Sequence, residues 1–112
     1  MHLKDLCKEA HRMAEDKGFW DQEDPNISEK LMLIVTELGE ACEALRTDNR
    51  QWIKLTNPSK SQWAKDTFED EIADTFIRLG DLCEALDIDI EWQIKQKMQY
   101  NKTRPAKHGK EF

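Results

Sequence analysis

The sequence is poor in the residues that mark several classes of protein. It has only four glycines and three prolines in 112 residues, which excludes collagen-like chains and Pro/Gly-rich disordered chains. Its longest apolar run, 31–35, is far shorter than the roughly 18 residues that a membrane span requires. The first residues carry charges in place of the apolar core of a signal peptide. We therefore expect a protein that is made without export and has no membrane partner.

Cysteine is also scarce. The three cysteines, Cys7, Cys42 and Cys83, are an odd number and include no CxxC pair, which argues against a disulfide framework and a zinc site. Each lies in a segment with helical periodicity, where a free cysteine behaves as a small hydrophobic residue. This use of cysteine predicts a cytoplasmic, reducing location.

Acidic residues outnumber basic ones, and the net charge is −6. From Lys95 to Phe112 the chain has six Lys or Arg and one Glu, a net of +5, so the first 94 residues carry −11. An acidic body argues against nucleic acid as a partner. The basic end can supply cations for a phosphorylated ligand, or it can be a solvated, frayed C-terminus, which is the interpretation that charge alone favours.

Apolar residues recur at three-to-four spacing along most of the chain, the pattern of amphipathic helices. No segment alternates with a period of two, and 51–62, with Pro58 and few periodic positions, is not assigned to a long helix. We predict one all-α domain over residues 1–112, with a basic tail at about 103–112. The expected helices run from Leu3 to Lys17, from Asn26 or Ser28 to Arg46, from Trp63 or Asp66 to Leu86, and from Asp87 or Asp89 to before Pro105.

The second and third expected helices each carry an apolar stripe, as a helix facing a core requires. The second is apolar over a wide arc because Leu33 and Ala44 lie outside its stripe. A chain this short covers only part of such an arc, so we expect a homodimer or homotetramer. The stripes consist of Leu31, Ile34, Val35, Leu38, Ala41, Cys42 and Leu45, and of Phe68, Ile72, Phe76, Leu79, Leu82, Cys83 and Leu86.

Pairs of acidic residues lie beside both stripes. Glu37 and Glu40 are three residues apart, as are Glu71 and Asp74, so each pair projects from one side of its helix. If the two helices pack together, four carboxylates meet in one groove, where they repel and lose hydration. A hard cation such as Mg²⁺, which takes oxygen ligands, compensates for this. The same acids can instead form the solvated border of two amphipathic helices, and spacing alone leaves both interpretations open.

Read with their neighbours, the acidic motifs resemble those of a known family. The metal-binding helices of the MazG-like all-α nucleoside triphosphate pyrophosphohydrolases are similar to LIVTELGEACEALR (33–46) and FEDEIADTFIRLGDLC (68–83). The tail of the short members resembles KMQYNKTRPAKHGKEF (97–112), and the similarity extends from about Gly18 to the end. One difference is the gap of 30 residues between Glu40 and Glu71, longer than is common in the family. The segment 50–65 within this gap is a candidate for shaping substrate choice.

The resemblance implies a four-helix bundle and a reaction. A nucleoside or deoxynucleoside triphosphate would be hydrolysed between its α and β phosphates to the monophosphate and pyrophosphate. Glu37, Glu40, Glu71 and Asp74 would hold Mg²⁺, with Mn²⁺ as a substitute. Metal coordination lowers the pKa of water and neutralises phosphate charge. Glu40 is our candidate for the carboxylate that orients or deprotonates the attacking water.

Phosphate groups need cations beyond the metal. Lys97, Asn101 and Arg104 are spaced i, i+4 and i+7, so they share one face of the last expected helix. The resemblance favours Lys97 and Asn101 as phosphate ligands, with Arg104, Lys107 and His108 as weaker candidates.

Two further residues are candidates for substrate contact. Arg78 can touch phosphate, or it can form a helical salt bridge with Asp74, four residues before it. Trp20 can stack on a base, since an aromatic ring can stack on any of the bases, or it can be an anchor in the core. The same two roles are possible for Trp52. His11 has no partner pattern and is assigned no role.

Three other functions compete with this one. A phosphoribosyl-ATP pyrophosphohydrolase-like enzyme is a related alternative, although the tail resembles that of the nucleotide-cleaning members. A non-catalytic helical interaction module would carry the same acids as surface decoration. A di-iron bundle requires Glu-x-x-His pairs, and neither Glu37 nor Glu71 has a histidine three residues later.

Overall fold

The computed structural model describes residues 1–51 and 63–105. Within these residues there are four helices and no strand, which confirms the all-α prediction. The helices are α1 (Leu3–Asp16), α2 (Ile27–Arg46), α4 (Phe68–Ala85) and α5 (Ile90–Lys102). The calls made for Trp52, Lys107 and His108, and most of the predicted tail, fall outside the described residues.

Three of the helices begin at a side-chain cap. The side chain of Asn26 accepts a hydrogen bond from the backbone N–H of Glu29, so α2 is capped by Asn26 and not by Ser28. Asp89 caps α5 in the same way. Thr67 caps α4, which therefore begins later than the predicted Trp63 or Asp66, and Asp66 itself has a left-handed φ of 67° that a helix does not accept.

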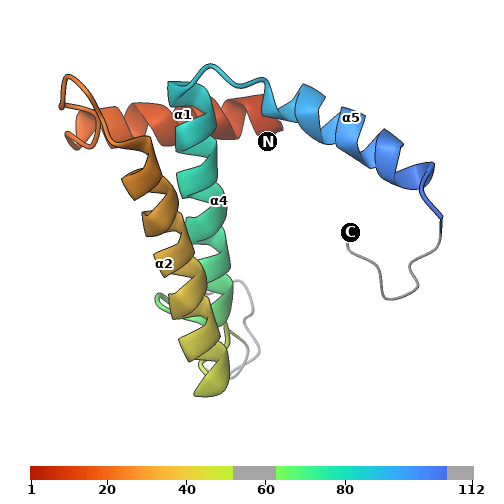
Figure 1. Ribbon diagram of the computed structural model, residues 1–112. Coiled ribbons are helices and arrows are strands. Elements are labelled where there is room, and N and C mark those ends of the chain that lie inside the picture. The colour runs from red at the N-terminus through yellow and green to blue at the C-terminus, as the bar shows by residue number, and fades with distance from the viewer. Residues whose placement is uncertain (52–62, 106–112) are drawn as a thin grey trace.

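Helices α2 and α4 lie side by side and run in opposite directions (Figure 1). Helix α1 crosses α4 at the end of the pair where α2 begins and α4 ends. The two helices come close together where they cross. A Cβ added at Gly80 of α4 would lie 3.5 Å from the Cα of Cys7 on α1. The buried apolar core is correspondingly modest, and consists of Cys7, Ala10, Ala14, Ile34, Ala41, Ala44, Leu82 and Cys83.

The prediction that both apolar stripes face the core is wrong in part. On α2 only Ile34 and Ala41 of the stripe are buried, and on α4 only Leu82 and Cys83 are buried. The two helices contact each other through the border between the apolar stripe and the acidic residues of each helix. Glu37 and Glu71 are therefore buried, while much of each stripe is left exposed. This leaves an exposed apolar face, formed by Leu31, Val35, Leu38, Cys42 and Leu45 of α2 with Phe76 and Leu79 of α4.

Helix α5 is not part of this packed unit. It runs from the end of α4 away from the α2–α4 pair, touches α1, and has no buried residue (Figure 1). The described chain is thus a three-helix unit with a projecting fourth helix, and closure into a four-helix bundle is not seen within one copy. Among the described residues, no helix is both long enough and apolar enough to cross a membrane.

Candidate metal centre

Three of the four predicted metal ligands meet at the contact between α2 and α4. Glu37 of α2 is 9% exposed and Glu71 of α4 is 6% exposed. One carboxylate oxygen from each of these residues and one from Asp74 all lie within 4.8 Å of one another. Carboxylates that come from two helices and meet this closely inside a protein are costly unless a cation or protons lie among them.

The fourth predicted ligand, Glu40, lies at the solvent edge of this group. It is exposed one turn beyond Glu37 on α2, and it lies close enough to Glu71 to raise the pKa of that carboxyl group. The structure thus brings the four acids into one acidic cluster, with two members buried and one facing water.

Arg78 is the cation next to the acidic cluster. Its Nε donates a hydrogen bond of 2.9 Å to Glu37 Oε1, across the interface between α4 and α2. The sequence offered a pair with Asp74 on the same helix as one role for Arg78, whereas the ion pair seen in the structure is with Glu37. One guanidinium group faces four carboxyl groups, so the cluster keeps an excess of negative charge.

This excess changes how the acids titrate. A hydrogen bond with Glu40, then burial, then the charges of Glu40, Glu37 and Asp74 raise the pKa of Glu71 from 4.5 to about 7. Burial and the charge of Asp70 raise the pKa of Asp74, although Arg78 acts in the opposite direction. Both shifts indicate carboxylates held where negative charge is unfavourable, a common property of functional sites.

A second acidic group adjoins the first through Glu71. Carboxylate oxygens of Asp66, Asp70 and Glu71 lie within 4.8 Å of one another, beside a cavity of about 340 Å³. Asp70 already accepts a hydrogen bond of 2.8 Å from the backbone N–H of Asp66. This group therefore has a structural role at the start of α4 that does not require a ligand.

The acidic cluster fits a hard divalent cation. Its donors are carboxylate oxygens, the ligands that Mg²⁺ and Mn²⁺ prefer, and among the described residues neither histidine nor cysteine belongs to it. Glu40 and Asp74 reach solvent, which leaves room for water and phosphate oxygens beside the buried pair.

A pocket of about 330 Å³ is lined in part by Arg78 and by none of the four acids. Its wall combines aromatic, apolar and charged side chains from the loop after α1, from α2 and from α4. The lining residues include Phe19, Trp20, Lys30, Leu33, Arg78 and Asp81. Because Arg78 contacts both the acidic cluster and this aromatic pocket, the two are neighbouring parts of one surface.

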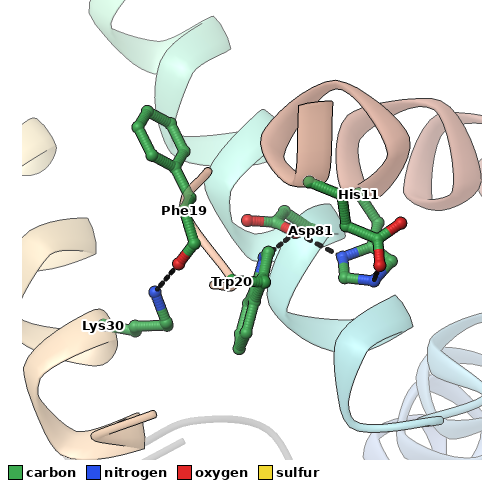
Figure 2. A network of polar contacts seen from close by, with 6 residues as sticks. His11, Phe19, Trp20, Lys30 and Asp81 are labelled. Carbon is green, nitrogen blue, oxygen red and sulfur yellow. Dashed lines mark hydrogen bonds and ion pairs between the residues drawn. The ribbon is translucent and has the colours of Figure 1, made fainter. Parts of the chain in front are cut away.

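Trp20 is held in the aromatic pocket by a polar network (Figure 2). Its indole Nε1 donates a hydrogen bond of 2.8 Å to Asp81 Oδ1, which also lies 2.8 Å from Nδ1 of His11. The rings of His11 and Trp20 meet edge to face at 5.6 Å, and the Lys30 Nζ lies 4.2 Å from the centre of the Trp20 ring. Lys30 also donates to the backbone oxygen of Phe19.

Sequence reasoning missed His11 and Asp81. Asp74, Arg78 and Asp81 are spaced by four and three residues, so they lie on the same side of α4. This spacing could have marked Asp81 as a candidate site residue. His11 contacts Asp81, which is 70 positions away in the sequence, and a contact over this separation cannot be predicted from a local sequence pattern.

The predicted phosphate ligands of α5 are not brought to the acidic cluster. Lys97 lies over the ring of Tyr100 on its own helix, and Arg104 contacts the same ring. The Oδ1 atom of Asn101 is buried and has no hydrogen-bond partner. Within the described parts of the chain, no ion pair is seen between α5 and the acids.

Comparisons of the chain with protein-family models, with curated proteins and with solved structures found no match. The function is therefore argued from the site itself.

Proposed function

We propose that the protein is a Mg²⁺-dependent nucleotide pyrophosphohydrolase of the MazG-like type. It would cleave a nucleoside or deoxynucleoside triphosphate to the monophosphate and pyrophosphate in the cytoplasm. The observation that carries the proposal is the burial of Glu37 and Glu71 at the contact between α2 and α4, where carboxylate oxygens of these two residues and of Asp74 lie within 4.8 Å of one another. Two buried carboxyl groups with a third beside them are costly in a purely structural interface.

Glu37, Glu71 and Asp74 would hold the cation, and Glu40 would complete the set from the solvent side. Bound Mg²⁺ would supply charge neutralisation for the triphosphate and a lower pKa for a coordinated water. The chain supplies the rest of the chemistry. Glu40 is the acid best exposed to accept a proton from water, and Arg78 lies close enough to the acidic cluster to pair with a phosphate oxygen.

The aromatic pocket is where the nucleoside would lie. Trp20 presents an aromatic surface that is held in place by its hydrogen bond to Asp81, and Arg78 separates it from the acids. Binding a base here would place the phosphates toward Arg78 and the acidic cluster. The mixed polar and apolar lining suits a base with an attached sugar.

A panel of nucleoside and deoxynucleoside triphosphates with Mg²⁺ tests the proposal, with pyrophosphate and orthophosphate measured separately. We expect pyrophosphate as the primary product and loss of at least a hundredfold in kcat for Glu71→Gln. Glu84→Gln, an exposed change on the same helix, is the matched control and should keep its turnover. Orthophosphate as the only primary product, or equal turnover in both variants, contradicts the proposal. Phosphoribosyl-ATP joins the panel as the related alternative substrate.

We also propose that the protein is a homodimer or homotetramer. The exposed residues Leu31, Val35, Leu38, Cys42 and Leu45 are spaced by four, three, four and three, the repeat with which one helix packs along another. An apolar stripe of this length is typical of an interaction surface. A non-catalytic interaction module would share this stripe, and the Glu71→Gln assay separates it from the enzyme.

A further inference from the structure

Asp81 has more hydrogen-bonding capacity than its contacts use. The indole Nε1 of Trp20 and Nδ1 of His11 both lie 2.8 Å from the same oxygen of Asp81, Oδ1. Within the described residues, no donor is seen on the other oxygen, Oδ2. An ionised carboxylate has about four acceptor positions on its two oxygens, so Oδ2 is an acceptor that still lacks a donor.

This second oxygen belongs to the wall of the aromatic pocket. Asp81 lines the pocket together with Phe19, Trp20 and Lys30. In Figure 2 the other oxygen of Asp81 points away from His11, to the side on which Phe19 and Lys30 lie. Only 17% of the Asp81 side chain is exposed, and a partly buried acceptor without a donor is unfavourable. A molecule bound in the pocket is therefore the natural source of that donor.

Trp20 determines how a flat ligand would meet this oxygen. An indole N–H points outward in the plane of its ring, so the hydrogen bond to Oδ1 places Asp81 beside the edge of Trp20. A base stacked on Trp20 lies parallel to the indole and presents its own edge to Asp81. The Nζ of Lys30, 4.2 Å from the centre of the Trp20 ring, is carried on a flexible stem and can move aside.

The donors in the pocket wall are already used by the protein. Trp20 donates to Asp81, Lys30 donates to the backbone oxygen of Phe19, and Arg78 donates through Nε to Glu37. What Asp81 adds to this wall is a negatively charged acceptor. The pocket therefore suits a base whose edge carries a donor.

Such an acceptor discriminates between bases. Cytosine and adenine carry an amino group, which is a donor, where uracil, thymine and hypoxanthine carry a carbonyl oxygen, which is an acceptor. A carboxylate accepts a strong hydrogen bond from the amino group and repels the carbonyl oxygen. A site built to bond an N–H group rejects the analogue that lacks it, because the polar group of the site is then left unpaired.

We propose that Asp81 selects the base of the substrate, because its Oδ2 accepts a hydrogen bond from the amino group of cytosine or adenine. Uracil, thymine and hypoxanthine are disfavoured. This inference rests on the proposed function for the identity of the ligand as a nucleoside triphosphate. Asp81 is thereby a specificity-determining residue, and Trp20 and His11 hold its carboxylate in position.

Two pairs of substrates that differ at this group test the inference in the wild-type protein: dCTP with dUTP, and dATP with dITP. Because a hydrogen bond to a charged group is lost in the second member of each pair, we expect kcat/KM to be at least about tenfold higher for the first. Equal values within both pairs, or higher values for dUTP and dITP, overturn the inference.

Asp81→Asn exchanges the acceptor for a donor at one atom. The amide oxygen of the new side chain can keep the contacts with Trp20 and His11, and its NH₂ group takes the place of Oδ2 and can donate to a carbonyl oxygen. The weaker hold on Trp20 affects every nucleotide alike, so the readout is the ratio of kcat/KM within each pair. We expect both ratios to fall at least about tenfold, toward dUTP and dITP. Unchanged ratios overturn the inference.

Glu29→Gln is the matched control. Glu29 also lines the aromatic pocket and loses the same charge in this variant, but its side chain is exposed. Both ratios should stay as in the wild type. A shift in Glu29→Gln with none in Asp81→Asn would assign selection of the base to Glu29, against the inference.

A second measurement does not depend on turnover. Isothermal titration calorimetry with dCMP and dUMP, without metal, should show dCMP bound more tightly by the wild type and the preference reversed in Asp81→Asn. If wild-type protein cleaves no nucleotide but shows this pattern, the proposed function fails and the role of Asp81 stands. If it releases pyrophosphate equally well from dCTP and dUTP, the proposed function stands and the role of Asp81 is refuted.

Discussion

Replacing Glu71 by glutamine should stabilise the metal-free protein at alkaline pH. Glu71 is 6% exposed, and its pKa is raised from 4.5 to about 7 by the hydrogen bond with Glu40, by burial and by the neighbouring acids. A raised carboxyl pKa means that the folded state binds the proton more tightly than the unfolded state does. The free energy of unfolding therefore falls as pH rises from about 4.5 to about 7, and the loss is complete above that window.

The size of the effect follows from the shift. Each pKa unit corresponds to about 1.4 kcal/mol, so ionising Glu71 costs the fold about 3 kcal/mol at most. Glutamine has the same shape and no charge to lose, so Glu71→Gln should recover much of this at pH 8 and little at pH 4. For a domain of this size, each kcal/mol moves the melting temperature by roughly 4–8 °C.

Thermal unfolding from pH 4 to pH 8, with and without Mg²⁺, is the assay. At pH 8 without metal the variant should melt above the wild type; added Mg²⁺ should raise the wild-type melting temperature and leave that of the variant nearly unchanged. Glu84→Gln should behave as wild type throughout. A variant that melts below the wild type at pH 8 without metal would show that Glu71 supports the fold as an anion, and the argument for a metal centre would be refuted.

Three further predictions concern the surface, the pocket and a cap. Leu38→Asp should convert the oligomer to a monomer in sedimentation at micromolar concentration, whereas Thr36→Asp, away from the apolar face, should not; a wild-type monomer would contradict the oligomer proposal. Asp81→Asn should raise KM for the nucleotide several-fold with a smaller change in kcat, because it weakens the network that holds Trp20; unchanged KM would remove the aromatic pocket from the site. Thr67→Ala should cost about 1–2 kcal/mol in urea unfolding, since it removes the cap of α4.

The helices could be predicted from the sequence because their signals are local. The end of α2 at Arg46 and the cap at Asp89 follow from apolar periodicity and side chains that bond nearby backbone. The start of α4 at Phe68 could not be predicted as well, since it depends on the left-handed backbone of Asp66 and on a hydrogen bond from Phe68 to Asn49 in another part of the chain.

Spacing predicted that the acids would gather in one groove, but it could not tell that Glu37 and Glu71 would be the two that are buried. A helical wheel places Glu37 and Glu71 at the borders of their stripes, and only the packing of α2 on α4 decides which border faces inward. The partner of Arg78 depends on the same packing, since Glu37 is 41 positions away in the chain. The His11–Asp81 contact, 70 positions apart, is likewise a property of how α1 crosses α4.

The departures from the expected pattern share one physical origin. The apolar residues that one copy exposes to water and the acids that it buries are both unfavourable, and a binding partner of the right chemistry would relieve each of them. A second copy would cover Leu38 and its neighbours, and a cation would offset the charge of Glu37 and Glu71. Oligomerisation and ligand binding should therefore be coupled. Magnesium with a non-hydrolysable triphosphate should tighten self-association in sedimentation, because a ligand bound between α2 and α4 would hold in place the two helices that carry the exposed apolar face.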